Sequence, residues 1–311
     1  MSDAAVGSWR QQFLHRHQLD TGYLASAQHW FDPLAEALVA HRNGASRPLL
    51  VGVNGCQGSG KTTFCDYLCT VLGAEHGLRT IALSLDDFYL PRTERRALAE
   101  RVHPLLVTRG VPGTHEMPLL LATLDALLEP RGARPVAVPR FDKGADDRVP
   151  RPQWDRVTLP LDIVLLEGWC LGAEQQSEAQ LATPCNALEQ QEDPLGHWRH
   201  YVNQCLATDF PPLHARIDRW VMLQAPSFDC VYRWRREQED KLIARRSGQA
   251  PARAMDASAL ARFIQHYERL TRHCLETLPG KMDDLLQLDQ QRRIVARQQR
   301  PEPHGLRERL F

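Results

Sequence analysis

The sequence predicts an α/β protein built on a doubly wound parallel sheet of about five strands, with helices on both faces and helical insertions. Short apolar runs carry this prediction, at residues 49–53, 80–85, 162–166, 219–223 and 284–288. The runs are continuous rather than alternating, which is typical of strands buried on both faces of a parallel sheet. Amphipathic stretches lie between them, at residues 62–72, 119–128, 231–246 and 260–275. This alternation of strands and helices indicates βαβ units.

The composition favours a globular protein that handles small molecules. The hydrophobic fraction is 43% and the charged fraction 24%, and 38 basic residues balance 38 acidic ones. Such a balance gives no overall field to attract nucleic acid or an anionic membrane, so we expect neither as a partner. No apolar run approaches the roughly 18 residues of a membrane span, and the amino terminus lacks a signal region. The eight cysteines include no C-x-x-C pair. We therefore expect a cytoplasmic protein with free thiols.

Changes in composition suggest how the chain is divided. Residues 1–46 are polar with apolar positions at helical spacing, which predicts an N-terminal helical extension before a main domain over 47–290. Within that domain, residues 173–213 are rich in Gln, Glu, Ala and Pro and predict a helical insertion. We place a lid at about 230–250 and a surface extension at 291–311, which is rich in Arg, Gln and Pro.

A glycine-rich segment follows the first strand directly. Residues 55–62, GCQGSGKT, fit the pattern G-x-x-x-x-G-K-[ST]. Glycines allow the backbone N–H groups to surround phosphates, and the following helix points its positive dipole end at them. A glycine-rich turn without a ligand is the alternative, but the position between a buried strand and a helix favours a P-loop. We therefore predict a P-loop NTPase-type fold that binds ATP and Mg²⁺. The expected nucleotide-binding residues are Gly55, Gln57, Gly58, Ser59, Gly60, Lys61, Thr62 and Thr63.

Within this loop, Lys61 can reach the β- and γ-phosphates and assist catalysis, while the Thr62 hydroxyl can bind Mg²⁺. Acidic residues follow two other predicted strands. Asp86 follows the second strand, where a carboxylate can accept the proton of an alcohol during phosphoryl transfer. Glu167 closes the strand at 162–166 and could hold Mg²⁺ or orient the nucleophile. A helix N-cap or a solvated turn remains the alternative for Asp86, and a purely structural role remains the alternative for Glu167. No N/T-K-x-D sequence is present, which disfavours a GTPase.

Arginines open the helix after the fourth strand, in the sequence YRWRR at 232–236. Arg233 and Arg236 are three residues apart and share one helix face, so we predict that both close over the phosphates and neutralise transition-state charge. Arg235 is expected to face solvent. The alternative is that all are surface arginines of an arginine-rich chain.

Two loops between the second and third strands carry cationic donors. They span residues 109–116, RGVPGTHE, and 139–143, PRFDK. Arginine can grip a carboxylate or a phosphate through two parallel hydrogen bonds, so these loops suit a small anionic acceptor. Taken singly, each residue could equally be structural. The predicted acceptor-binding residues are Asp87, Tyr89, Arg109, His115, Arg140 and Lys143.

Several of these segments together resemble the plant and fungal D-glycerate 3-kinase family, whose wider relatives are uridine kinase, pantothenate kinase and phosphoribulokinase. The similar blocks keep the family's order over about residues 48–290, and they are 51–63, 84–90, 109–115, 139–143, 167–172 and 231–235. The resemblance implies an ATP-dependent kinase with Asp86 in the place of the catalytic base. It also implies that Arg109, His115 and Arg140 line the acceptor pocket, and that D-glycerate is converted to 3-phosphoglycerate.

One departure from the family lies on the acceptor side. The segment after Lys143 is shorter than in plant members and has GADDR at 144–148 in place of G-R-G-D-R. A different acceptor, such as a nucleoside, a pantothenate-like compound or a sugar phosphate, therefore stays open. A regulator that binds ATP without turnover is the alternative of another class, against which the acidic residues and Lys61 count. Cys56, inside the glycine-rich loop, is expected to have a lowered pKa because it precedes a helix.

Overall fold

The computed structural model describes residues 3–131, 134–245 and 257–301 and confirms the predicted α/β class. Its main sheet has the strand order β10-β9-β8-β1-β7-β2, and only the pair β9–β10 is antiparallel. The strands are β1 (Leu49–Gly55), β2 (Thr80–Ser84), β7 (Ile163–Gly168), β8 (Arg219–Gln224), β9 (Asp284–Leu288) and β10 (Ile294–Gln299). All five predicted strands are present.

The last strand corrects the prediction for the end of the chain. Residues 291–311 were expected to form a surface extension, but β10 pairs with β9 along the sheet edge. Arg297 donates hydrogen bonds of 3.0 and 2.6 Å to Asp284 Oδ1, which anchors this polar strand. Residues 302–311 of the predicted extension lie outside the described residues.

The strands are apolar throughout because they supply two cores. Successive side chains of a strand point to opposite faces of the sheet. On β1, Leu50 packs into one core, and Val51 packs into the other. On β7, Val164 and Leu165 divide in the same way. Both faces of the sheet are therefore buried, which explains the continuous apolar runs in the sequence.

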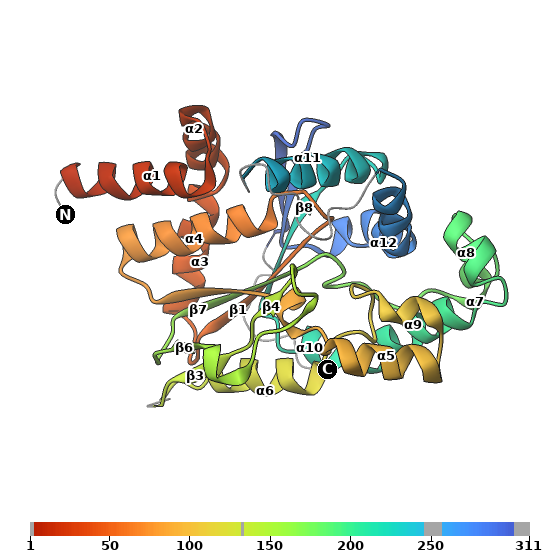
Figure 1. Ribbon diagram of the computed structural model, residues 1–311. Helices are drawn as coiled ribbons and strands as arrows, with labels where there is room; N and C mark the ends of the chain where they lie inside the picture. Colours follow the sequence, from red (N-terminus) through yellow and green to blue (C-terminus); the bar gives the residue numbers. More distant parts are fainter. Residues whose placement is uncertain (1–2, 132–133, 246–256, 302–311) are drawn as a thin grey trace.

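Helices cover both faces, as Figure 1 shows. One face carries α1 (Asp3–His17), α2 (Thr21–Trp30), α3 (Asp32–Asn43), α4 (Lys61–His76) and α11 (Asp229–Arg245). The other carries α5 (Arg92–Arg101), α6 (Met117–Leu127), α9 (His197–Thr208) and α10 (Pro211–His214). Helix α12 (Ala257–Thr277) contributes to both cores, with Leu260 in one and Leu270 in the other. The remaining helices are α7 (Glu178–Leu181) and α8 (Ala187–Glu192), and the 3-10 turns are η1 (Leu85–Phe88), η2 (Pro104–Val107), η3 (Arg151–Gln153) and η4 (Pro279–Lys281).

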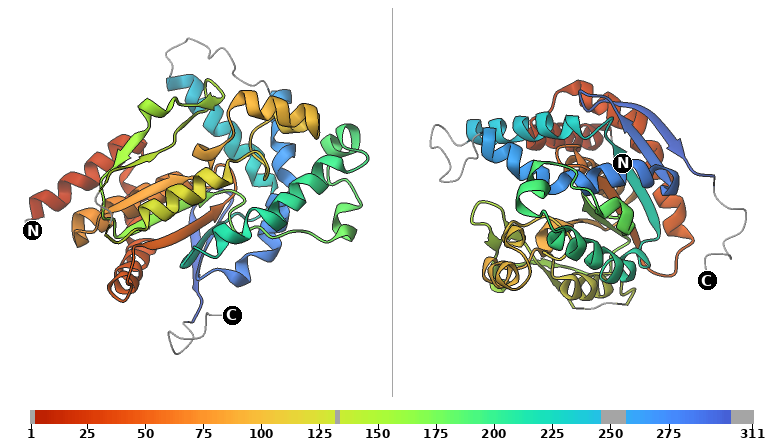
Figure 2. Two further views of the ribbon diagram at one scale, coloured as in Figure 1. Left: turned by 90° about the horizontal axis from the view of Figure 1, so that it is seen from below. Right: turned by 90° about the vertical axis from the view of Figure 1, so that its right-hand side faces the viewer.

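The N-terminal helices belong to the core of the sheet. Phe13, Leu34 and Leu38 are fully buried and share a cluster with β1, and Tyr67 of α4 donates a 2.7 Å hydrogen bond to Asp32. Figure 2 shows α1 and the helices of the predicted insertion, α7 and α8, at opposite ends of the molecule. The predicted domain boundaries stay predictions, and residues 1–2 of the extension and 246–250 of the lid lie outside the described residues. Among the described helices, none is long and apolar enough to cross a membrane.

The segment at residues 139–143, predicted as a loop, is instead part of a β-arm. Strand β3 (Val136–Val138) pairs with β6 (Asp155–Val157), and β4 (Phe141–Asp142) pairs with β5 (Asp147–Arg148). We call residues 136–157 the arm. Polar contacts hold it to η1 and its flanks, because Phe141 N–H donates to Asp87 at 3.1 Å and Arg148 donates to the Tyr89 carbonyl at 2.6 Å.

Candidate active site

The glycine-rich loop joins β1 to α4 in a conformation that requires glycine. Gly58 and Gly60 have φ angles of 78° and 97°, in the left-handed region that disfavours other residues. A side chain at position 58 would also begin 2.7 Å from Cβ of Trp234. The loop is therefore shaped by close backbone approach, as a phosphate-binding loop must be.

Several polar groups of this loop have no hydrogen-bond partner among the residues that the structure describes. The Ser59 hydroxyl and the Gln57 side-chain amide are buried without a hydrogen bond among the described residues. Lys61 folds back over the loop and donates to the Cys56 carbonyl at 3.2 Å. Because buried polar groups are normally satisfied, these groups fit a loop whose partner is an anionic ligand. Gly55 ends β1, and Thr62 and Thr63 occupy the first turn of α4.

The strand order places the predicted acidic residues at the same end of the sheet as the glycine-rich loop, where the parallel strands have their carboxyl ends. Strand β7 lies between β1 and β2, and Glu167 is in register with Ser84 of β2 and Val53 of β1. Asp86 follows Ser84 by two residues in η1. The carboxyl ends of parallel strands are where ligands of such sheets bind.

Thr62, Glu167 and Lys61 form one contact group. The Thr62 hydroxyl donates to Glu167 Oε1 at 3.2 Å, and Lys61 Nζ lies 3.9 Å from Glu167 Oε2. The described residues contain no group of three or more His, Cys, Asp or Glu side chains able to hold a metal by themselves. A hydroxyl beside a single carboxylate fits Mg²⁺, which takes one or two protein oxygens and completes its shell with phosphates and water.

Asp86 is held ionised by its neighbours. Lys143 Nζ donates to Oδ2 at 2.6 Å, and the Tyr89 hydroxyl donates to Oδ1 at 2.8 Å. Burial acts to raise the pKa of Asp86, but the charge and hydrogen bond of Lys143, the Tyr89 hydroxyl and the charge of Lys61 outweigh it and lower the pKa to about 2. The carboxylate can thus accept hydrogen bonds over the whole physiological pH range.

His115 is the unusual member of the acceptor set. Its ring stacks on Tyr89 with centroids 4.6 Å apart, and its backbone bridges that of Tyr89. The side chain is buried, and neither ring nitrogen has a hydrogen-bond partner among the described residues. Burial lowers the pKa of His115 to about 4, although the Asp86 charge acts in the opposite direction. A neutral imidazole beside the carboxylate is therefore available to a ligand.

The predicted cationic residues of the acceptor side each bond a protein carboxylate. Arg140 donates to Asp87 at 2.8 Å and to Asp155 at 2.7 Å. Arg109 forms a close ion pair with Asp146. Burial raises the pKa of Asp87, and the hydrogen bonds of Phe141 N–H and Arg140 offset part of that effect. The structure thus brings together the predicted acceptor residues from η1, the loop at 109–116 and the arm.

The arginines of helix α11 point in other directions than the sequence predicted. Arg233 donates to the Gln290 carbonyl at 3.0 Å, beside the β9–β10 turn, and Arg236 is exposed. Arg235, expected to face solvent, is half-buried, and its charge opposes the effect of burial in raising the pKa of Tyr267. That expectation is wrong, since Arg235 lies near Tyr267, whose hydroxyl bonds the start of the loop at 109–116. The catalytic roles of Arg233 and Arg236 stay predictions.

Two residues near the site were missed. Trp234 is fully buried and packs on Gly58 of the glycine-rich loop. Tyr267 lies in the amphipathic stretch predicted at 260–275, where it falls among the apolar core positions, but its hydroxyl donates to the Arg109 carbonyl at 3.1 Å. The available signal was a tyrosine in a stripe of otherwise apolar residues, because a buried tyrosine hydroxyl usually finds a hydrogen-bond partner.

The expectation for Cys56 is also wrong. Burial raises the pKa of Cys56 to about 12, and the opposing charge of Lys61 is smaller in effect. The thiol is therefore protonated, in spite of its place before α4.

Several known proteins similar to this chain are named as kinases. No family model matches the chain. The uncharacterized kinase mug58 of Schizosaccharomyces pombe is 32% identical over 243 residues, which cover 76% of this chain and 84% of that protein. The chloroplastic D-glycerate 3-kinase of Arabidopsis thaliana is 31% identical over 243 residues, covering 74% of this chain and 48% of that one. The solved structure of D-glycerate 3-kinase from Cryptococcus neoformans matches with a TM-score of 0.69 and 27% identity, covering 86% of this chain and 96% of that one.

The chain belongs to the D-glycerate 3-kinase family. It is a small-molecule kinase of the P-loop class, and its kinase relatives imply the use of ATP. The matched part of the chain covers about half the length of the Arabidopsis protein and nearly the whole of the Cryptococcus structure.

Proposed function

We propose that this protein transfers the γ-phosphoryl group of ATP to a hydroxyl of a small hydroxylated carboxylate, and that the acceptor is D-glycerate, which becomes 3-phosphoglycerate. The observation that supports this most strongly is the placement of Asp86 at the tip of β2, beside the Thr62–Glu167–Lys61 group at the tips of β1 and β7. An acid beside a phosphate-binding loop is what transfer to an alcohol needs.

In this proposal the loop at 55–62 binds the phosphates of ATP through its backbone N–H groups, and Lys61 leaves the Cys56 carbonyl to contact them. Thr62 and Glu167 would hold Mg²⁺, which would supply positive charge to offset the negative charge of the phosphates. Arg233 and Arg236 would contribute only if α11 moves, since Arg233 is bonded to Gln290 here.

Asp86 accepts the proton of the acceptor hydroxyl as the oxygen attacks the γ-phosphorus and ADP leaves. Tyr89 orients the carboxylate through its 2.8 Å hydrogen bond. Lys143 bonds the other carboxylate oxygen, and its departure when the acceptor binds would leave that oxygen free for the acceptor hydroxyl. Its position at the tip of the arm allows the ammonium group to turn toward the acceptor or the transferred phosphoryl group.

The acceptor lies between Asp86 and His115 in this proposal. The ring nitrogens of His115, which have no partner in the described part of the chain, offer one donor and one acceptor to a hydroxylated carboxylate. Arg109, Arg140 and Lys143 supply positive charge around it. The choice of D-glycerate is supported by the names of the Arabidopsis and Cryptococcus relatives.

The test is release of ADP by the purified full chain with MgATP and D-glycerate, compared with a few dozen other hydroxylated metabolites. D-glycerate is expected to give the highest kcat/KM. A higher value with a nucleoside, a pantothenate-like compound or a sugar phosphate would replace the acceptor. ATP binding without ADP release for any compound would favour a regulator over an enzyme.

A further inference from the structure

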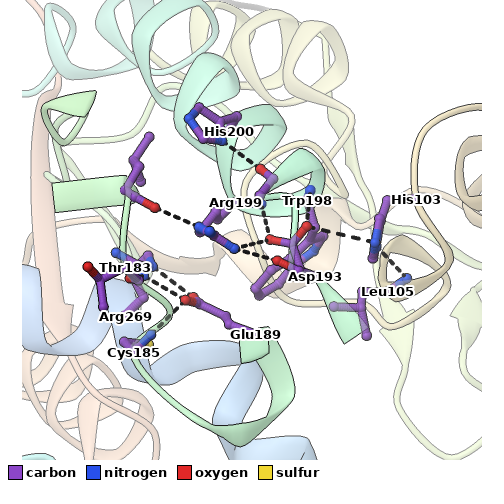
Figure 3. Close-up of polar contacts among 12 residues, drawn as sticks. His103, Leu105, Thr183, Cys185, Glu189, Asp193, Trp198, Arg199, His200 and Arg269 are labelled. Carbon is purple, nitrogen blue, oxygen red and sulfur yellow. Dashed lines mark hydrogen bonds and ion pairs between the residues drawn. The ribbon is translucent and has the colours of Figure 1, made fainter. Parts of the chain in front are cut away.

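The predicted insertion takes no part in the proposed chemistry, yet buried ion pairs fix it to α12. Glu189 is fully buried and accepts hydrogen bonds of 2.7 and 2.6 Å from Arg269. Arg269 also donates to the carbonyls of Gln180 and Thr183. Figure 3 shows these groups converging from the insertion and from α12. Separating such a buried pair is strongly destabilising, so the insertion and α12 move together.

A second buried pair fixes α9, the longest helix of the insertion. Asp193 accepts from the backbone N–H groups of Trp198 and Arg199 at 2.9 and 3.2 Å, and the Arg199 guanidinium returns to it at 3.0 Å. His103, which precedes the acceptor-side loops, lies 3.8 Å from the same carboxylate. Figure 3 shows Arg199 and His103 directed at Asp193 from different elements.

The acceptor loop, defined as residues 109–115, lies between these two braced helices. Gly110 has a φ of 140°, and a side chain there would begin 2.5 Å from the Tyr267 hydroxyl of α12. Gly113 has a φ of 90°, and a side chain there would begin 2.6 Å from the Tyr201 ring of α9. The loop thus fits against both helices only because it has glycine at both contacts.

Tyr267 holds the start of the acceptor loop through a hydrogen bond. Its hydroxyl donates to the Arg109 carbonyl at 3.1 Å, and its ring meets Trp169 edge-to-face with centroids 4.9 Å apart. Trp169 in turn donates to the Gly110 carbonyl at 3.0 Å. The first peptide groups of the acceptor loop are therefore held by two hydrogen bonds from outside the loop.

The other end of the acceptor loop is bonded to the segment that carries Asp86. Leu90 N–H donates to the Thr114 carbonyl at 2.9 Å, and Glu116 N–H donates to the Phe88 carbonyl at 2.8 Å. Inside the loop, Thr114 accepts from Gly110 N–H at 3.1 Å. A displacement at Gly110 is thereby passed to Thr114 and to its neighbour, His115.

We propose that Tyr267 is a positioning residue for the acceptor: its hydroxyl fixes the start of the acceptor loop, so that Arg109 and His115 are presented toward Asp86, and the insertion braces α12 for this purpose. The inference rests on the proposed function, since it assigns the acceptor loop to acceptor binding. In this arrangement Tyr267 bonds the acceptor loop rather than either substrate, so its loss would act through the loop.

The experiment compares Tyr267→Phe with Tyr201→Phe in the full chain, using MgATP and D-glycerate. Tyr267→Phe is expected to raise KM for D-glycerate about tenfold, which corresponds to roughly 1.4 kcal/mol, with kcat and KM for ATP within about twofold. Tyr201→Phe is the matched control, because it keeps the ring against Gly113 and removes a hydroxyl that bonds Cys205 of its own helix. Its KM for D-glycerate is expected to stay within about twofold of wild type.

An unchanged KM for D-glycerate in Tyr267→Phe, or an equal rise in KM for ATP, would overturn the proposal. If the wild type releases no ADP with D-glycerate, the proposed acceptor fails, and the positioning role is then measured by amide hydrogen exchange. Faster exchange over residues 105–116 in Tyr267→Phe than in Tyr201→Phe, with residues 55–62 unchanged, supports the role. Equal exchange in the two variants refutes it.

Discussion

Lys143 lowers the pKa of the proposed catalytic base, Asp86, and replacing Lys143 tests that electrostatic arrangement. The ammonium group lies 2.6 Å from Asp86 and heads the influences that lower the carboxyl pKa against the effect of burial. Lys143→Met keeps most of the apolar length of the side chain and removes the charge. We expect the pKa of Asp86 to rise in this variant, because burial is then opposed only by Tyr89 and Lys61.

The size of the effect follows from the pKa of Asp86. A fall from the ordinary value of 3.8 to about 2 corresponds to roughly 2.5 kcal/mol in favour of the ionised form. Loss of a close opposite charge raises a carboxyl pKa by about 1–3 units, so the variant's Asp86 should titrate at roughly pH 3 to 5. Because the pKa of Asp86 is lower in the folded state than in the unfolded chain, the pair with Lys143 stabilises the fold above about pH 4. This contribution is lost as the pH falls toward 2.

The assay is the ¹³C chemical shift of aspartate carboxyls against pH, with the Asp86 signal assigned from its absence in Asp86→Asn. The kcat/KM for D-glycerate between pH 4.5 and 8 is a second measure, in which only the variant should decline at the acid end. Lys281→Met is the matched control, since Lys281 pairs with Glu174 at the surface, 2.7 Å away. An Asp86 pKa in Lys143→Met equal to that of wild type would refute the arrangement.

Three further outcomes are expected. Asp86→Asn should lower kcat by about 100-fold or more while KM for ATP stays within about threefold, measured by ADP release; near-wild-type turnover would remove Asp86 from the mechanism. Arg140→Ala should raise KM for D-glycerate more than KM for ATP, because Arg140 fixes Asp87 and the arm through bonds of 2.8 and 2.7 Å; equal changes would exclude a role on the acceptor side. Cys56→Ser should leave the rate of inactivation by mild peroxide unchanged, since burial keeps this thiol protonated, and slower inactivation of the variant would show a reactive thiol.

The strands could be predicted where burial on both faces leaves a contiguous apolar signal, as in Leu50 and Val51 of β1. β10 gave no such signal. Its sequence, Ile294–Gln299, is partly exposed and polar, and it is held by the ion pair between Arg297 and Asp284. Pairing of this kind depends on a residue elsewhere in the chain, so a local pattern cannot report it.

The site also has parts that could be predicted from the sequence and parts that could not. The place of the loop at 55–62 was predictable because its motif consists of consecutive residues. The places of Asp86 and Glu167 were predictable because both residues stand at the ends of apolar runs. The orientation of α11 was not. A spacing of three residues indicates which arginines share a face, but not where that face points. Trp234 decides it by packing on Gly58, which turns Arg233 toward Gln290.

The acceptor side has less net positive charge than its three cations alone suggest. Arg109, Arg140 and Lys143 each face a protein carboxylate, contributed by Asp146, by Asp87 with Asp155, and by Asp86. A carboxylate acceptor therefore meets no free cation among these three and must exchange with an existing partner. Lys143 should exchange its carboxylate partner at the lowest free-energy cost, since its side chain is 61% exposed against 36% for Arg140 and 21% for Arg109. Exchange at Lys143 also uncovers the Asp86 oxygen that the acceptor hydroxyl needs, so binding of the anion and release of the base are expected to be one event.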